Sequence, residues 1–357
     1  MTTEEQKISG FSKWIKENQN AKQTVFQALL SILLSIFIGA ILLIANGRNP
    51  IEAYQSLIFG AFGSIDRLTE TFVKITPLLL IAVSVSISFK CQFWNIGAEG
   101  QFLMGAIFSG WVALTFAQLP VWILFPFTFI AGSIGGALWC GLAGVLKAYL
   151  QVNEVISTTM MNYIAVYFLA YLVKGPLMDG TWPQSPVFDR SLILPRIIPG
   201  TRLNVAFIIA LIFLILAIFF WRSVIGNKIK IVGANQHVAK VIGLKVPRMI
   251  IFVALISGAL VGIAGWGDLF GLHFRLIEQI ESGLGSLGIV VALLGELHPI
   301  GMLFSSIFFG ALVVGGNAME RNAGVPFALV EVIQGSVILL VLARSYFFKK
   351  KKLKNES

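Results

Sequence analysis

The sequence has 357 residues, of which 57% are hydrophobic and only 12% are charged, and its mean hydropathy is +0.84. A soluble domain carries about twice that charged fraction, so the composition excludes an ordinary soluble protein and indicates an integral membrane protein with many spans. The formal net charge of +10 does not indicate a nucleic-acid partner, because the basic residues lie in loops and tails between apolar segments, as the positive-inside rule predicts.

The apolar segments predict an all-α, polytopic membrane protein with about ten transmembrane helices, some of them broken or re-entrant. The predicted spans lie at about 24–45, 68–89, 102–119, 121–146, the latter part of 151–173, 203–221, 249–266, 285–295, a segment after Pro299, and 326–343. The span at 285–295 is too short to cross, because about ten residues at roughly 1.5 Å each cover only half of a hydrocarbon core of about 30 Å. Residues 47–67, by contrast, are predicted to be polar and rich in turns.

We expect a membrane domain at 23–345 between an N-terminal tail at 1–22 and a basic C-terminal tail at 346–357. Placing both tails inside puts eighteen of the 27 Lys and Arg residues on the cytoplasmic side and eight outside, with one in a span. This asymmetry predicts a multi-pass protein of the cell membrane, embedded in the lipid bilayer, with both termini in the cytoplasm.

The longest polar interruption in the second half, at 223–248, would then lie in the cytoplasm. Asn235 is a good N-cap and Gly243 a good residue for ending a helix, so the sequence predicts a short helix between them. Val238, Val241 and Ile242 give it one apolar stripe. From these residues alone, the helix either rests on lipid headgroups or docks a soluble partner.

Two glycine-rich interruptions mark a candidate transport pathway. They are WNIGAEGQ at 94–101 and a stretch with glycines at 283, 285, 288 and 295. Backbone outside a helix is tolerated at membrane depth only where protein or a water-filled cavity surrounds it, and broken segments in both halves of a chain indicate a pathway. Amide side chains suit a neutral solute with many hydroxyls. The residues expected to line the pathway are Asn95, Glu99, Gln101, Asn153, Asn162, Gly285 and Gly288.

No residue pattern indicates an enzyme. His237, His273 and His298 are scattered, Cys91 and Cys140 are far apart, and no H-E-x-x-H, activated nucleophile or phosphate-binding loop occurs. We therefore expect no catalytic residue, no metal site and no cofactor, and any ATP would be hydrolysed by a partner subunit. An intramembrane enzyme and an ion-coupled secondary transporter remain as alternatives.

Five segments in order resemble one family of membrane proteins. They are NIGAEGQF at 95–102, NEVISTTMMNYIA at 153–165, GANQHVAKVIGL at 233–244, IVVALLGELHPIG at 289–301 and VIQG at 332–335. Together they resemble the permeases of ABC importers in the ribose and branched-chain amino acid superfamily. Within it, the chain is most similar to the larger permease of bacterial nucleoside importers that work with a Bmp-type lipoprotein receptor.

The resemblance implies ATP-driven translocation of nucleosides by alternating access, with ribose, another sugar or a branched-chain amino acid as alternative solutes. It implies a heterodimer with a second, homologous permease, cytoplasmic ABC ATPase subunits and an extracellular substrate-binding lipoprotein. It also maps the family's coupling helix onto 233–244, which favours docking over resting on lipid. The residues implied in ATPase coupling are Gly233, Asn235, Val238, Ala239, Val241, Ile242 and Gly243, although many relatives carry alanine where this chain has Val238.

Overall fold

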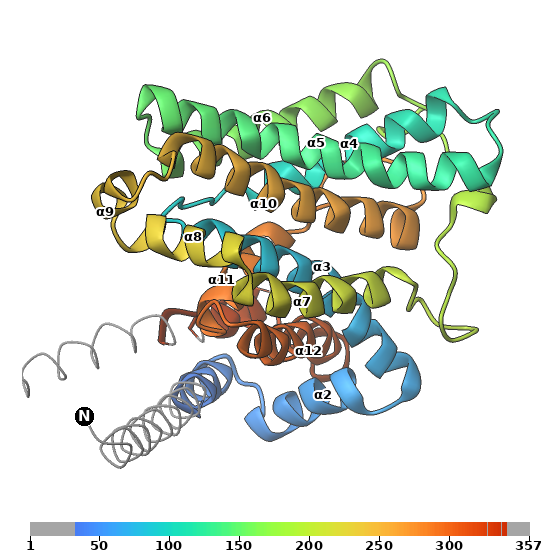
Figure 1. The fold of residues 1–357 in the computed structure, drawn as a ribbon. Coiled ribbons are helices and arrows are strands. Elements are labelled where there is room, and N and C mark those ends of the chain that lie inside the picture. The colour runs from blue at the N-terminus through green and yellow to red at the C-terminus, as the bar shows by residue number, and fades with distance from the viewer. Residues whose placement is uncertain (1–32, 327, 337, 341–357) are drawn as a thin grey trace, which may run out of the picture. The chain divides into compact units, whose positions relative to one another are not determined.

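The computed structural model describes residues 33–326, 328–336 and 338–340, and these residues are mostly helical and contain no β-strand. The two predicted tails lie outside the described residues. Figure 1 shows the order of the elements. They are α2 (Pro50–Phe62), α3 (Ile65–Lys90), α4 (Ala98–Thr115), α5 (Val121–Leu150), α6 (Glu154–Lys174), the short 3-10 helix η1 (Arg190–Leu192), α7 (Ala206–Arg222), α8 (Val224–Ala234), α9 (Gln236–Val241), α10 (Val246–Asp268), the π-helix η2 (Leu269–His273), α11 (Leu284–Leu294) and α12 (Pro299–Ala323).

Among the described residues, five helices are long and apolar enough to cross a membrane: α3, α5, α6, α10 with its π-turn, and α12. A sixth span results if α7 and α8, which meet at a bend of 71°, are taken as one. These helices support a multi-pass membrane protein, but they do not confirm the expected count of about ten. The difference lies partly in shorter apolar helices, such as Leu33–Ala45 and α11.

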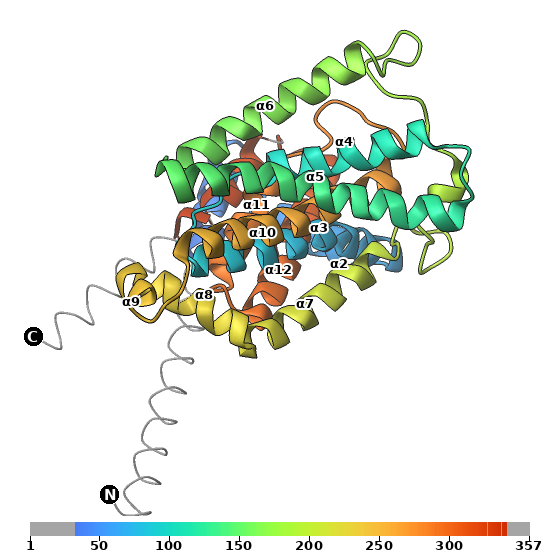
Figure 2. The ribbon, with the colours of Figure 1, turned by 45° about the horizontal axis from the view of Figure 1, so that its top comes forward.

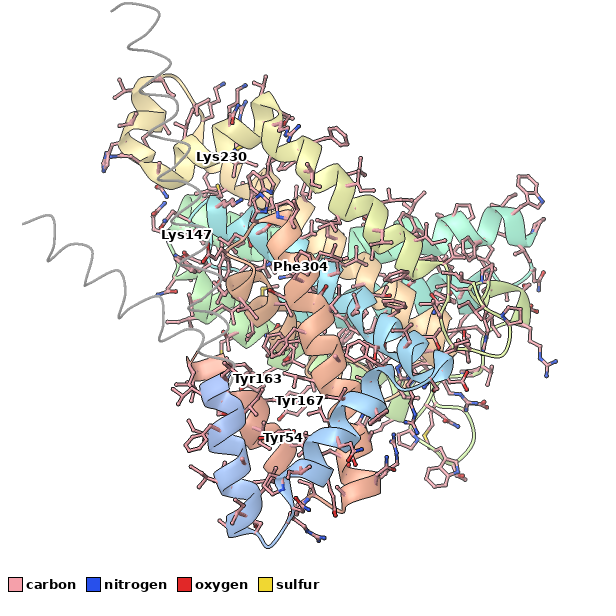
Figure 3. The ribbon with its side chains drawn as sticks, turned by 90° about the horizontal axis from the view of Figure 1, so that it is seen from below. Tyr54, Lys147, Tyr163, Tyr167, Lys230 and Phe304 are labelled. Carbon is pink, nitrogen blue, oxygen red and sulfur yellow. The ribbon has the colours of Figure 1, made fainter. Side chains whose placement is uncertain are left out.

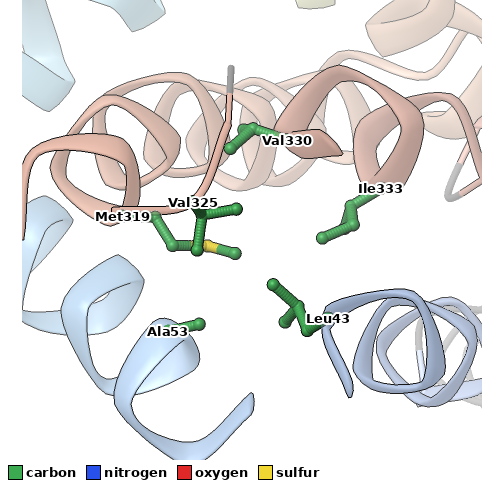
Figure 4. Close-up of a cluster of buried hydrophobic side chains, with 6 residues drawn as sticks. All are labelled: Leu43, Ala53, Met319, Val325, Val330 and Ile333. Atoms are coloured by element: carbon green, nitrogen blue, oxygen red, sulfur yellow. The ribbon is translucent and has the colours of Figure 1, made fainter. Parts of the chain in front are cut away.

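The described chain divides into two compact units, and the smaller one combines residues up to Gly60 with residues from Gly315 onward. Figure 4 shows its apolar cluster, to which the helix at 33–45, α2, α12 and the segment after α12 contribute. The buried members are Leu43, Ala53, Met319, Val325, Val330 and Ile333. In the same unit, the hydroxyl of Tyr54 donates to the carbonyl of Ile36 at 2.6 Å.

The prediction that residues 47–67 form turns is wrong, because α2 occupies most of this stretch. Asn49 accepts a hydrogen bond from the backbone N–H of Ile51, and Pro50 begins the helix, which is a favourable start. Ala53 lies in the buried cluster and Leu57 packs against it. A cap, an initial proline and an apolar face were all visible in the sequence.

The larger unit, Ala61–Val314, is built around α3. In the most apolar window of α3, 89% of residues are buried, compared with 28% in α5 and 22% in α6. Figures 1 and 2 show α10 lying beside α5 along its length. Glycines make this close contact possible: a Cβ atom on Gly258 would overlap the carbonyl of Gly136, and one on Gly262 would overlap that of Gly132. These glycines recur four residues apart on each helix, and small residues at that spacing let two helix backbones approach closely.

In each half of the larger unit, a long helix is followed by a non-helical segment, and the next helix begins only after that segment. In the first half, α3 ends at Lys90 and residues 91–97 lead into α4. In the second, α10 continues into the π-turn, and residues 274–283 lead into α11, which has only 11 residues. The predicted short helix at 285–295 is therefore confirmed.

Candidate functional site

The first non-helical segment is held by a fully buried pair of amides. The Asn95 side-chain NH₂ donates to Oε1 of Gln101 at 3.1 Å, and the Gln101 NH₂ donates back to Oδ1 of Asn95 at 2.7 Å. Oδ1 of Asn95 also accepts from the backbone N–H of Gly97. The pair fixes the turn from segment 91–97 into α4 because each amide satisfies the other without water.

The amide pair is anchored to the long helices by two serines. The Asn95 NH₂ donates to Oγ of Ser257 on α10 at 3.0 Å, and Oγ of Ser84 on α3 donates to the Ser257 carbonyl at 2.7 Å. At a rise of about 1.5 Å per residue, Ser257 lies roughly 16 Å along α10 from Val246. Segment 91–97 thus folds back from the end of α3 against the middle of α10.

Helix α6 satisfies the backbone of this re-entrant segment. Oγ1 of Thr158 accepts from the N–H of Ile96, while the Asn162 amide donates to the Ile96 carbonyl at 3.0 Å and accepts from the Gly100 N–H at 2.8 Å. Backbone groups at membrane depth need such partners, since lipid offers none. Asn162 therefore links α6 to both sides of the break.

The two glycine-rich interruptions meet at Glu99. This residue lies in the first turn of α4, and its Oε1 accepts from the hydroxyl of Ser286 at 2.7 Å, and from the Ser286 N–H at 3.4 Å, in the first turn of α11. A Cβ atom on Gly285 would overlap Glu99, so only glycine permits this approach. The carboxylate is thus placed between two helix N-termini, where the helix dipoles favour negative charge.

The structure brings most of the predicted pathway residues together but separates two of them. Asn95, Glu99, Gln101, Asn162 and Gly285 all surround the start of α4. Asn153 instead caps α6 by accepting from the Val155 N–H, and Gly288 packs against Ile81 of α3. The serines and threonine of this network, Ser84, Ser257, Ser286 and Thr158, were not predicted, because isolated hydroxyls are common in apolar helices and only the fold shows their partners.

Two helices, α8 and α9, follow α7 instead of the one short helix predicted within 223–248. Ser223 caps α8, and Asn235 caps α9 by accepting from the N–H groups of His237 and Val238. Gly243, with a φ of +84°, follows the end of α9 in the left-handed conformation that favours glycine. Both predicted boundaries of the helix are therefore confirmed, whereas α8 was missed.

The apolar stripe of α9 points away from the protein. Val241 is 86% exposed, and Val238 and Ile242 are each more than half exposed. Ala239, by contrast, is completely buried and holds α9 in place. Figure 1 shows α9 at one extremity of the larger unit, beyond α8. An exposed apolar surface of this kind indicates a contact with lipid or with another protein.

Helix α8 links α9 to the end of α3. A Cβ atom on Gly233 would overlap the carbonyl of Lys90, so the two backbones touch. The Lys90 ammonium lies 4.2 Å from the centre of the Trp221 ring, and the Lys230 ammonium donates to the Trp221 carbonyl at 2.9 Å. Movement of α8 and α9 would therefore act directly on the residue that precedes segment 91–97.

Comparison with known proteins places this arrangement in a family. The model of the branched-chain amino acid transport system / permease component family matches residues 67–342. The nucleoside ABC transporter permease protein NupB of Lactococcus lactis subsp. cremoris is 34% identical, covering 91% of this chain and 92% of its own. The guanosine ABC transporter permease protein NupP of Bacillus subtilis is 33% identical (89% and 92%). The glucose ABC transporter permease protein TsgB13 of Haloferax volcanii is 32% identical (89% and 87%).

The two bacteria named above each hold a second, more distant relative of this chain. NupC of Lactococcus lactis is 23% identical, covering 75% of this chain and 88% of its own, and NupQ of Bacillus subtilis is 25% identical (78% and 90%). The family match covers the re-entrant segments, the amide network and both helices that follow α7. The chain therefore belongs to the branched-chain amino acid transport system / permease component family and is a multi-pass membrane permease.

Proposed function

We propose that this chain is the membrane-spanning permease subunit of an ABC importer that carries nucleosides into the cell by ATP-driven alternating access. The observation that carries the proposal is the similarity, over about nine tenths of the chain, to permeases named for nucleoside and guanosine transport. The buried amide network and the non-helical segments that precede α4 and α11 support a transport role, since interrupted helices within a membrane domain are typical of a solute pathway.

In this proposal, segments 91–97 and 274–283 border the solute pathway and rearrange during transport. The roles predicted for Asn95, Gln101 and Asn162 then become more specific, because their amides bind one another and the backbone. They hold the re-entrant segment that borders the pathway, and Glu99 with Ser286 and Gly285 joins it to α11. Gly288 lets α11 approach α3, and Asn153 fixes the start of α6.

The exposed face of α9 is proposed as the docking surface for a cytoplasmic ABC ATPase. Val238, Val241 and Ile242 offer the apolar contact, and Asn235 and Gly243 define the helix that presents it. Ala239 fixes this helix to the protein. Gly233, through its contact with Lys90, passes the movement to the re-entrant segment.

The remaining proposed partners are a second, homologous permease and an extracellular substrate-binding lipoprotein. The paired relatives in Lactococcus lactis and Bacillus subtilis support a heterodimer of two permeases. Docking of an ATPase at α9 requires that α9 be cytoplasmic, which agrees with the orientation predicted from the Lys and Arg distribution and with cytoplasmic termini.

A sugar is the second candidate solute, because one of the three most similar relatives is named as a glucose permease. A competition experiment distinguishes a nucleoside from a sugar as the transported solute. Cells that express the complete importer should take up radiolabelled uridine, and excess unlabelled adenosine should inhibit this uptake while excess glucose should not. Uptake of radiolabelled glucose, with no uptake of either nucleoside, would replace the nucleoside by a sugar and leave the permease role intact.

A further inference from the structure

The second re-entrant segment, residues 274–283, is joined to the long loop between α6 and α7. We refer to this loop, residues 175–205, as the outer loop. Figures 1 and 2 show it at the end of the larger unit opposite α9, and Figure 3 shows Lys147 and Lys230 together at the other end. In the proposed orientation α9 is cytoplasmic, so the outer loop lies outside the cell.

The outer loop runs antiparallel to the stretch at 270–277 and satisfies its backbone. Three backbone N–H groups of the loop donate to carbonyls of this stretch at 2.9 or 3.0 Å: Ser185 to Leu276, Phe188 to Phe274, and Leu194 to Phe270. Non-helical backbone in a membrane domain needs such partners. The outer loop therefore does for this stretch what Thr158 and Asn162 do for segment 91–97.

Ser185 binds both backbone groups of Leu276. Its N–H donates to the Leu276 carbonyl, and its Oγ accepts from the Leu276 N–H at 2.9 Å. The side-chain oxygen thus takes the place that a backbone carbonyl has in a regular antiparallel pair. Because both residues are completely buried, Leu276 cannot turn away without leaving two buried groups unpaired, and Ser185 fixes its position.

Buried apolar side chains strengthen the same connection. Phe188 is 5% exposed and lies against Phe270, with the ring centres 5.1 Å apart. Phe188 and Leu276 together cover Gly110 of α4, where an added Cβ atom would lie 3.2 and 3.1 Å from them. Separation of the loop from the segment would expose these side chains and break four hydrogen bonds, whereas a joint movement keeps all of these contacts.

We propose that the outer loop and the second re-entrant segment move as one body during transport, with Ser185 as the residue that positions the segment. The inference rests on the function proposed above. A protein that displaces the outer loop from outside the cell then acts directly on the segment that leads to Ser286 and its contact with Glu99. The outer loop is thus the extracellular counterpart of α8 and α9, which reach segment 91–97 through Gly233 and Lys90.

A disulfide between the loop and the segment tests the joint movement. Gln184 and Ile277 form an antiparallel bridge, and residues opposite each other in such a pair lie about 4.5–5.5 Å apart, within the range of a disulfide. The native Cys91 and Cys140 are buried. A Gln184→Cys/Ile277→Cys pair in the assembled importer should therefore cross-link under mild oxidation, and the cross-linked importer should take up radiolabelled uridine without loss.

A loss of uptake on oxidation that reduction reverses would overturn the proposal, because the loop would then have to leave the segment during transport. A pair that never cross-links would overturn the contact itself. In both cases the nucleoside function stands, since the reduced importer still takes up uridine. An unsubstituted importer that takes up no uridine would overturn the proposed function and this inference together.

Loosening the contact provides the second measurement. Ser185→Ala removes the acceptor for the Leu276 N–H and should lower uridine uptake about tenfold, roughly the effect of one lost buried hydrogen bond on an equilibrium. ATP hydrolysis by the assembled importer should stay close to the parent rate, because α8 and α9 are unchanged. Ser185→Thr keeps the hydroxyl and should restore uptake.

Thr201→Ala is the matched control for this measurement. It removes a buried hydroxyl of the same loop that bonds within its own turn, to the Ile198 carbonyl, and should leave uptake unchanged. A merely structural role of Ser185 would lower uptake and ATP hydrolysis equally. Such an equal fall, or parent-like uptake by Ser185→Ala, would overturn the positioning role.

Discussion

Gly233 of α8 lies directly against the backbone carbonyl of Lys90, the last residue of α3. This contact joins the helix pair α8 and α9 to the start of segment 91–97, whose other end is fixed by Asn95 and Gln101. A displacement of α9 would therefore be transmitted through α8 and Lys90 to segment 91–97.

A larger residue at position 233 should uncouple the movement of α9 from the movement of segment 91–97. Gly233→Val would force α8 away from Lys90, because the carbonyl of Lys90 is backbone and cannot rotate aside. We expect uptake to fall to a small fraction of the parent rate while the amount of permease in the membrane stays similar, as measured by radiolabelled uptake and immunoblot. Asn227→Leu adds bulk at an exposed position of the same helix and serves as the control. Parent-like uptake by Gly233→Val would argue against this route.

A charge on the exposed stripe of α9 should abolish ATPase docking without unfolding the permease. Val241→Asp alters a side chain that is 86% exposed, so the thermal stability of the purified permease should not change, while copurification of the ATPase should be lost. Asn227→Asp, at an exposed position of α8, makes the same change in charge away from the stripe and should retain the ATPase. Full copurification with Val241→Asp would remove the docking role from this face.

The Asn235 cap should matter less than the stripe. Asn235→Ala removes the acceptor for two backbone N–H groups, and losing an N-cap costs about 1 kcal/mol of helix stability. We expect weaker, not absent, ATPase copurification, with Asn235→Asp restoring it. A complete loss that Asn235→Asp does not rescue would indicate that Asn235 contacts the partner itself.

The buried amide pair should act as one unit in stability. Asn95→Leu leaves the Gln101 amide and the Gly97 N–H without a partner, and each unpaired buried group costs about 1–3 kcal/mol. The double variant Asn95→Leu/Gln101→Leu should have a higher melting temperature than the sum of the two single-variant decreases predicts. Strict additivity of the two decreases in melting temperature of the purified protein would contradict the pairing. Asn153→Ala, at an exposed cap, is the control and should lower the melting temperature only slightly.

The contact between α4 and α11 can be tested by cross-linking. A Glu99→Cys/Ser286→Cys pair should form a disulfide under mild oxidation, because α4 and α11 approach so closely here that a Cβ atom on the adjacent Gly285 would overlap the backbone of Glu99. We expect the cross-link to block uptake and reduction to restore it, since alternating access requires the two helix starts to move. A Glu99→Cys/Ile289→Cys pair, one helical turn further along α11, should cross-link poorly. A pair that never cross-links would refute the contact, and free uptake in the cross-linked protein would refute the movement.

Local signals predicted several features of this molecule because each depends on a few neighbouring residues. Asn235 and Gly243 determine the ends of α9. The short helix at 284–294 followed from counting apolar residues between glycines. All of these depend on backbone geometry that the sequence encodes directly.

Other features depend on contacts between distant residues and could not be predicted. The partners of Asn95 include Ser257, 162 positions away, and Glu99 meets Ser286 across 187 positions. The orientation of Ala239 also needed the structure: a bulky residue there would displace α9 itself, so Val241 is the better site for testing docking. The helix at 50–62 was missed although its cap and proline were visible, because its polar flanks indicated turns.

The measurement that tests the central claim most directly is uptake of radiolabelled uridine, adenosine, ribose and glucose in three strains. One lacks this gene, one has it restored, and one has it restored beside an ATPase whose phosphate-binding lysine is substituted. The account predicts nucleoside uptake in the second strain alone. Equal nucleoside uptake in the second and third strains would contradict it, because the permease would then work without ATP hydrolysis and would be an ion-coupled carrier.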